Sequence, residues 1–206
     1  MRCTLPLLGT VLIGVVLTAG ARADRLINVP EATKLVAGTV RYEQMYGLSN
    51  RAIQRESFLY AVDDTVEIEA RHFRSSGRDD TTLDLYATII SPFKGYAPGF
   101  AIGVRDALDA TRDGFRPWIA VTFREPYQIG EIERGADLTI GAFFGQRGSA
   151  LVGFSIPVGP DLRFLAENDG YRLSAGVQYA PIRNLELRLL TEDLTPLGSF
   201  RYSLRF

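Results

Sequence analysis

The segment GSFRYSLRF, residues 198–206, ends the chain and alternates apolar and polar side chains without a break. Its apolar positions are Phe200, Tyr202, Leu204 and Phe206. The positions between them carry serine or arginine, so an extended strand here has one apolar and one polar face. The segment therefore predicts a β-strand whose two faces lie in different environments.

The same alternation recurs upstream, in YRLSAGVQY (171–179) and NLELRLL (184–190), and turn residues such as Asn168-Asp169-Gly170 separate the runs. We expect twelve strands, at about 39–46, 53–62, 65–73, 81–90, 99–105, 117–124, 137–145, 149–156, 161–167, 171–179, 184–191 and 198–206. The pattern predicts an all-β fold, a single antiparallel up-and-down barrel. The strand assignment is weakest for the fifth and sixth runs and for a long connection over 125–136. If one pair of these strands does not form, the barrel has ten strands.

The N-terminus has the pattern of an export signal. A basic Arg2 precedes the apolar run LPLLGTVLIGVVL (5–17), and Ala21-Arg22-Ala23 forms a small-x-small cleavage site. The run is short for a membrane-spanning helix, and Cys3 lies upstream of it, which is the wrong place for a lipid-anchored cysteine. We expect a signal peptide over 1–23 and one domain over 24–206.

Composition narrows the function classes for residues 24–206. This part contains no cysteine, and it has 21 basic against 24 acidic residues, a formal charge of −3. A nucleic-acid partner would favour a clustered basic face, so none is expected. No His/Cys cluster has zinc spacing, and no cofactor motif is present, so neither a metal nor a cofactor is expected.

Alternation alone does not say which face of the sheet meets the core. In a soluble barrel the apolar face points inward, whereas in an outer-membrane barrel it points to lipid and the polar face lines the lumen. In the second arrangement charges of both signs would pair across the lumen. The predicted lumen set is Arg41, Glu43, Glu67, Glu69, Arg71, Asp84, Arg105, Arg163, Arg172, Glu186, Arg188, Arg201 and Arg205. Tyr86 and Phe143 would also point inward and narrow the bore.

The C-terminus favours the membrane arrangement. Outer-membrane barrels end on an amphipathic strand with a terminal aromatic residue, and Phe206 with Leu204, Tyr202 and Phe200 fits that pattern. In proteins of that class this segment is the insertion signal. We therefore expect outer-membrane location, with lipid and the barrel-assembly machinery as partners. An even strand count would place both termini, and the short turns at 63–64, 157–160 and 181–184, on the periplasmic side.

Three stretches resemble a known family. LINVPEATKLVAGTV (26–40) is similar to the "INxP…xGT" opening of several bacterial outer-membrane barrels. APGFAIGVRDAL (97–108) and LAENDGYRLSAGVQYAPIRNLELRLL (165–190) resemble segments of the YjbH-like family of exopolysaccharide-associated outer-membrane proteins. The resemblance implies a barrel, and it implies partners in envelope biogenesis or polysaccharide export.

No catalytic constellation stands out. His72 is the only histidine and no Gly-x-Ser-x-Gly elbow exists, so we interpret His72 as an interfacial residue. The pairs Asp63-Asp64 and Asp79-Asp80 are interpreted as turn residues, and Trp118 as an interfacial or lumen-filling aromatic. We expect a non-enzymatic outer-membrane barrel with a structural, accessory or narrow-pore role. The alternatives are a soluble periplasmic barrel that binds a small ligand and, with less support, an outer-membrane enzyme.

Overall fold

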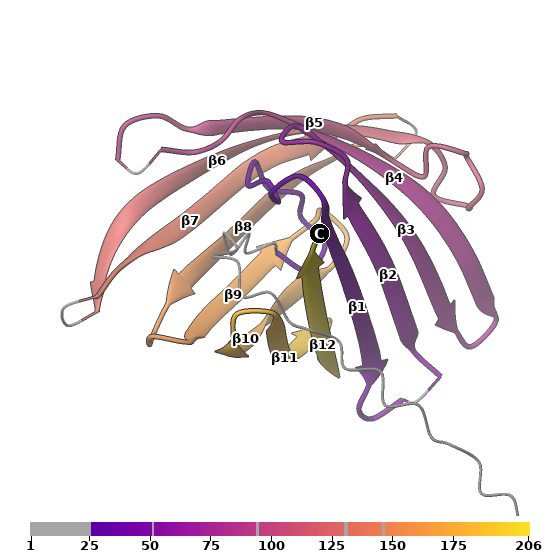
Figure 1. The fold of residues 1–206 in the computed structure, drawn as a ribbon. Helices are drawn as coiled ribbons and strands as arrows, with labels where there is room; N and C mark the ends of the chain where they lie inside the picture. Colours follow the sequence, from indigo (N-terminus) through magenta and orange to yellow (C-terminus); the bar gives the residue numbers. More distant parts are fainter. Residues whose placement is uncertain (1–25, 51, 94, 130–131, 146) are drawn as a thin grey trace, which may run out of the picture.

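The computed structural model describes residues 26–50, 52–93, 95–129, 132–145 and 147–206, and its regular elements are strands (Figure 1). The predicted signal peptide, residues 1–23, lies outside the described residues. The strands are β1 (Thr39–Gly47), β2 (Gln54–Ala61), β3 (Val66–Ser75), β4 (Arg78–Ile90), β5 (Gly99–Arg105), β6 (Arg116–Ile129), β7 (Ile132–Phe143), β8 (Ser149–Pro157), β9 (Leu162–Asn168), β10 (Leu173–Ile182), β11 (Leu185–Glu192) and β12 (Thr195–Arg205). In the part of the chain that the structure describes, no helix is long and apolar enough to cross a membrane.

Each strand pairs antiparallel with the next along the chain, and β1 pairs with β12, so the sheet closes into a twelve-stranded barrel. The closing pair runs in unbroken register from Thr39 opposite Arg205 to Gly47 opposite Leu197. Closure leaves no strand edge unpaired. The predicted twelve-stranded barrel is confirmed, and the ten-stranded alternative is wrong.

Burial alternates along the strands as the sequence pattern predicts. On β11, Glu186 and Arg188 are buried, whereas Leu187 and Leu189 are exposed. The charged face therefore points into the barrel and the apolar face points out. Tyr86 and Phe143 are also buried, in agreement with the inward positions expected for them.

The predicted connection over 125–136 is wrong. β6 and β7 continue through it as a hairpin in which Glu125 lies opposite Ala136, and Figure 1 shows this long hairpin along the left side of the barrel. Arg124 donates two hydrogen bonds to the Asp137 carboxylate, at 2.6 and 3.0 Å, and so joins the two strands. Pro126 and the charged residues around it interrupt the apolar alternation that identifies the other strands.

The connections fall at two ends of the barrel. The short turns 62–65, 158–161 and 183–184 lie at the end where β1 begins and β12 finishes, which we call the terminal end. The opposite end, which we call the mouth, holds the loops 48–53, 76–77, 106–115, 144–148, 169–172 and 193–194. The three turns that the sequence predicts to lie with the termini share the terminal end with the start of β1 and the end of β12. The N-terminal part of the described chain lies toward the mouth instead, where Asn28 is bonded to Glu167 and Glu192.

Residues 26–38, which we call the plug, run inside the barrel ahead of β1. Figure 1 shows this indigo segment within the ring of strands. The plug side chains Leu26, Val29 and Ala32 are at most 1% exposed and belong to the same core as Trp118. Gly153 on β8 makes room for Leu26, because a Cβ atom there would overlap the Leu26 side chain. The alternating pattern of the sequence does not predict this plug.

Candidate functional site: the charged lumen and the cavity at its mouth

A cluster of four charged side chains joins the neighbouring strands β1, β12 and β11 along the lumen wall, rather than across the lumen as predicted. Arg201 lies 2.8 Å from the Glu43 carboxylate and 3.0 Å from that of Glu186. Arg188, whose side chain is fully buried, lies 3.5 Å from Glu43 and donates a 2.9 Å hydrogen bond to Gln178 on β10. Each carboxylate therefore faces a guanidinium group. Such paired geometry is what allows ionised groups to stay inside a protein.

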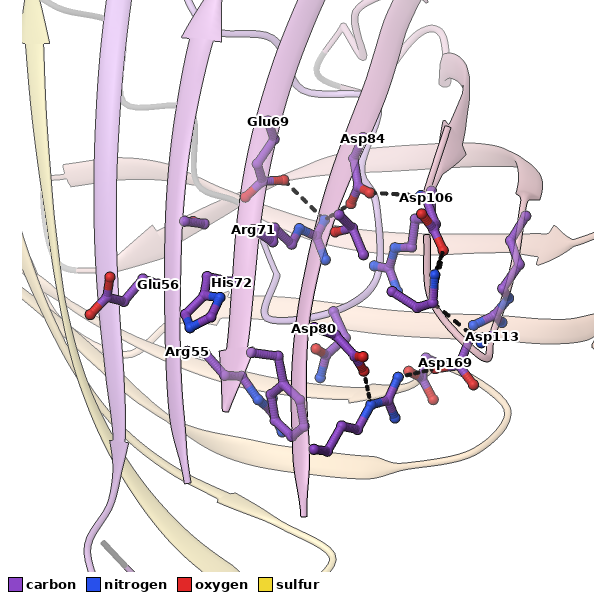
Figure 2. A pocket seen from close by; sticks show the side chains of 18 of the residues that line it. Arg55, Glu56, Glu69, Arg71, His72, Asp80, Asp84, Asp106, Asp113 and Asp169 are labelled. Carbon is purple, nitrogen blue, oxygen red and sulfur yellow. Dashed lines mark hydrogen bonds and ion pairs between the residues drawn. The ribbon is translucent and has the colours of Figure 1, made fainter. Parts of the chain in front are cut away.

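A second cluster links β3 and β4 (Figure 2). The Arg71 guanidinium lies 2.9 Å from both Glu69 and Asp84. The Tyr86 hydroxyl donates to Glu69 at 2.6 Å, and it is also hydrogen-bonded to Arg71. Asp84 in turn accepts the backbone N–H of Asp106 at 2.9 Å, which fixes the start of the loop 106–115. The cluster therefore connects the barrel wall to a mouth loop.

Glu167 on β9 holds the N-terminal part of the plug. Its carboxylate accepts three consecutive backbone N–H groups, from Ile27 at 2.9 Å, Asn28 at 2.6 Å and Val29 at 3.1 Å. Glu167 is 3% exposed. A buried carboxylate that receives three donors both satisfies its own charge and pins the backbone that supplies them.

Further wall residues hold the rest of the plug. Glu67 accepts the backbone N–H of Leu35 at 2.8 Å, and the Thr122 hydroxyl accepts that of Ala32 at 2.9 Å. The Asn28 side chain donates to Glu192 at 3.1 Å, and Glu192 is also paired with Arg55. The plug is thus bonded to strands on several sides of the barrel, which makes it part of the lumen wall's hydrogen-bond network.

A cavity of about 320 Å³ lies between the plug and the mouth loops. Figure 2 shows charged side chains from β2, β3 and β4 converging on it with those of the loop 106–115. Among the described residues, seven arginines and eight carboxylates line it, so the two signs nearly balance. Local pairing, rather than net charge, must therefore decide what the cavity attracts.

Asp113 ties three mouth segments together over this cavity. Its carboxylate lies 3.0 Å from Arg78 at the start of β4, and it is also hydrogen-bonded to Arg147 in the loop 144–148. Burial raises the pKa of Asp113, but the hydrogen bond from Arg78 and the charges of Arg78 and Arg147 outweigh burial and hold the pKa below its usual value.

Arg105 and Arg116 end β5 and begin β6, and they lie directly opposite one another. Their guanidinium carbons stand 4.7 and 4.2 Å from the centre of the Phe143 ring, and that of Arg116 also lies 5.2 Å from the Tyr171 ring. Arg116 is 8% exposed. Within the described part of the chain, the buried Nε of Arg105 and the Nε and Nη2 of Arg116 have no hydrogen-bond partner.

The structure encloses most of the predicted lumen set. Arg41, Glu67, Glu69, Asp84, Glu186, Arg188 and Arg201 are buried, and Glu43, Arg71, Arg105, Arg163 and Arg172 are half-buried. Arg163 donates to Ser155 at 2.8 Å and Arg172 lies 3.4 Å from Glu192. Arg205 is exposed, opposite Thr39 at the terminal end, so it takes no place in the enclosed clusters.

Four residues on which the lumen depends are absent from the predicted lumen set, namely Arg116, Asp137, Glu167 and Glu192. The alternation contains the signal for three of them. Glu167 is on the same face of β9 as Arg163, Glu192 is on the same face of β11 as Arg188, and Asp137 is on the same face of β7 as Phe143. Strict alternation would therefore have placed all three inside. Nothing in the sequence pairs Glu167 with the plug.

His72 alternates with Arg71 along β3 and lies near the mouth, where it is among the residues that border the cavity (Figure 2). Its Nδ1 lies 3.1 Å from the Thr81 hydroxyl and its Nε2 lies 3.5 Å from Asp79. Asp79 lies in β4 rather than in a turn, which corrects the interpretation of Asp79-Asp80, because the turn is confined to residues 76–77. Among the described residues, no group of three His, Cys, Asp or Glu side chains could hold a metal ion.

Asp63 has the turn role expected of it. Its carboxylate accepts the backbone N–H groups of Thr65 at 2.6 Å and Val66 at 2.7 Å. These two hydrogen bonds favour the charged form and lower the pKa of Asp63. The side chain therefore organises the turn between β2 and β3.

The residues of the predicted insertion signal share the outer face of β12. Tyr202, Leu204 and Phe206 are 36%, 37% and 88% exposed, and Phe200 is half-buried against Tyr42 of β1, with the ring centres 6.0 Å apart. The segment thus presents an apolar edge next to the closing pair of strands. Its use as a signal stays a prediction.

Comparison with known proteins adds no assignment to this arrangement. No family model matches the chain, and a search of curated proteins finds no significant relative. The resemblance to the YjbH-like family therefore stays a prediction.

Proposed function

We propose that the mature chain is an outer-membrane β-barrel protein with no catalytic role, whose lumen is closed by its own N-terminal plug. The observation that carries the proposal is the inverted distribution of side chains. Leu189 and Phe58 are 57% and 50% exposed on the outside, whereas Arg188 and Arg201 are 3% and 2% exposed inside. Lipid is the solvent that such an exterior suits.

The outer apolar surface has the extent that a membrane requires. On β12 the outward positions from Pro196 to Leu204 are apolar or glycine over nine residues, and a strand needs about 9–11 residues to span a bilayer. Toward the mouth, the outward positions of β1 to β4 become polar at Gln44, Glu56, His72 and Thr81. This change marks where the apolar belt ends and the headgroup region would begin.

A soluble barrel that binds a small ligand is the main alternative. Such a barrel would bury apolar side chains and turn its charges to water. Here large apolar side chains are exposed on the outward face of successive strands, including Ile119, Leu138, Ile140 and Val152. The distribution favours a lipid-facing barrel over a soluble one.

The contents of the lumen argue against a general porin. The plug is bonded to the wall at Glu167, Thr122 and Glu67, and the ion-pair clusters occupy space beside it. A structural or accessory role, or a narrow pore, fits such a lumen better than free diffusion of solutes. Partners in envelope biogenesis or polysaccharide export belong to this proposal through the family resemblance alone.

Fractionation tests the proposal directly. The mature protein should begin at Asp24, stay in the outer-membrane pellet after urea and carbonate washes, and migrate differently in SDS gels when unboiled. Recovery in the soluble periplasmic fraction would overturn the membrane placement and favour the ligand-binding barrel.

A further inference from the structure

The guanidinium pair of Arg105 and Arg116 lacks the acceptors that buried donors require. Two like charges face each other across neighbouring strands, an arrangement that is unfavourable by itself. Phe143 supports both groups through its ring face, but a ring does not accept the in-plane N–H bonds that guanidinium offers. Buried polar groups in folded proteins are nearly always hydrogen-bonded, so these free donors call for a partner.

Asp106 and Asp169, which line the same cavity, already have other donors. Asp106 accepts the backbone N–H groups of Ala110 and Thr111, both at 2.8 Å. Asp169 accepts those of Tyr171 at 3.0 Å and Arg172 at 2.8 Å. These bonds shape the mouth loops, and they leave the two guanidinium groups without a carboxylate bonded to them among the described residues.

We infer that the mouth cavity binds a small ligand through an oxyanion, a carboxylate or phosphate group, held between Arg105 and Arg116. Both residues line the cavity, and a planar guanidinium can present two parallel N–H groups to either oxyanion. Tyr171 also lines it and is half exposed, so its ring offers a surface for the body of the ligand. The volume of about 320 Å³ suits a ligand of monosaccharide size.

Calorimetric titration of the refolded mature chain, in neutral detergent at constant ionic strength, tests the inference with inorganic phosphate, glucuronate and glucose. We expect saturable binding of at least one oxyanion and none of glucose. Preference for phosphate would identify a phosphate-bearing ligand, and preference for glucuronate a sugar acid. Absence of binding by both oxyanions, or equal binding of glucose, would overturn the inference.

Two variants locate the binding. Arg105→Gln and Arg116→Gln should each raise the dissociation constant at least about tenfold, as expected when charged hydrogen bonds are lost. Arg74→Gln is the matched control. This substitution removes the same charge near the mouth, but Arg74 is paired with Asp79 and does not line the cavity. It should leave binding within about twofold. An equal loss in all three variants would show a general charge effect and contradict the site.

Chemical protection in the wild-type protein covers the case in which a variant fails to fold. Phenylglyoxal modifies arginine side chains, and mass spectrometry identifies which ones react. The bound oxyanion should protect Arg105 and Arg116 and leave Arg74 reactive. Equal reactivity of Arg116 with and without the oxyanion would overturn the assignment.

Discussion

At the residue scale, individual charged side chains stabilise the interior of this barrel. Removing most of them would leave a buried partner without its hydrogen bond or ion pair. Glu167 shows this most directly, since three backbone N–H groups of the plug depend on its two oxygens. Arg201 is the corresponding cation, since Glu43 and Glu186 both depend on it.

Glu167→Gln should loosen the plug without opening the barrel. The amide replaces one acceptor oxygen by a donor, and a hydrogen bond to a charged group contributes about 1.5–3 kcal/mol. Hydrogen exchange at residues 27–29 should accelerate at least about tenfold in the variant. Glu125→Gln, which changes an exposed carboxylate, is the control and should leave that exchange unchanged. Unchanged exchange in Glu167→Gln would show that other contacts hold the plug.

Arg201→Met should destabilise the folded barrel by about 3–5 kcal/mol, because it removes the closest guanidinium partner of Glu43 and Glu186 and leaves them only Arg188, at 3.5 and 3.9 Å. Urea unfolding of the refolded protein measures this change. Arg205→Met, at an exposed position of the same strand, should cost less than about 0.5 kcal/mol. Adding Glu43→Gln to Arg201→Met should cost less than the sum of the two single changes, and strict additivity would contradict the coupling.

Part of this interior could be predicted from the sequence. Glu43, Arg188 and Arg201 lie on regular alternating strands, so parity alone places them inside. Glu167 and Arg116 could not be assigned a role in the same way. Their role depends on the plug and on Phe143, and the contact of Glu167 with the backbone of Asn28 joins positions 139 residues apart.

At the scale of the element, strands were predictable wherever all outward side chains are apolar and all inward side chains are polar, because the sequence then alternates regularly. β10, β11 and β12 alternate strictly, and their positions follow from the sequence to within a few residues. The β6–β7 hairpin was hidden because Pro126 and Glu125 interrupt the pattern. The plug was hidden because it makes no strand, and its bonds go to side chains rather than to a neighbouring backbone.

Substitutions on the outer face of β12 should affect insertion, whereas a substitution on its inner face should not. Tyr202→Asp puts a charge on the outer face, which meets lipid in the proposed membrane location, and deletion of Phe206 removes the terminal aromatic residue, so both should block insertion. Ser203→Asp adds the same charge on the inner face, opposite Arg41, and should be tolerated. Heat-modifiable migration of membrane fractions measures the outcome. Normal insertion of both outer-face variants would refute the insertion signal.

The mouth loops should respond to acid through Asp113. Because the folded pKa of Asp113 is lowered, its stabilising contribution is complete at neutral pH and is lost as the pH falls from about 4, the ordinary aspartate pKa, through the lower folded value. Hydrogen exchange in residues 106–115, corrected for intrinsic rates, should increase over that range. Asp113→Asn should show fast exchange already at neutral pH, and an acid response equal to that of the wild type would exclude Asp113 as its cause.

At the scale of the whole molecule, the plug is bonded to the barrel wall at several strands, and we propose that it closes the lumen. A planar-bilayer recording on the refolded wild type should show no stable, large, porin-like conductance steps. Replacing residues 26–35 by a Gly/Ser linker of equal length should raise the conductance, because that change removes the segment bonded to Glu167 and Thr122. Large steps in the wild type would show that the lumen is open.

The distant bonds of the plug also set an order of events in folding. Asn28 is bonded to Glu192, 164 positions later, so the first part of the folded chain finds its partner only after nearly all the rest has been made. Contacts between such distant positions slow folding, because the chain loses much freedom before they form. A growing sheet can still admit the plug from its open side, whereas the pairing of β1 with β12 would enclose it. We therefore expect the plug to enter before β1 pairs with β12, so the rate of that pairing would decide what fraction of the protein folds with the plug inside.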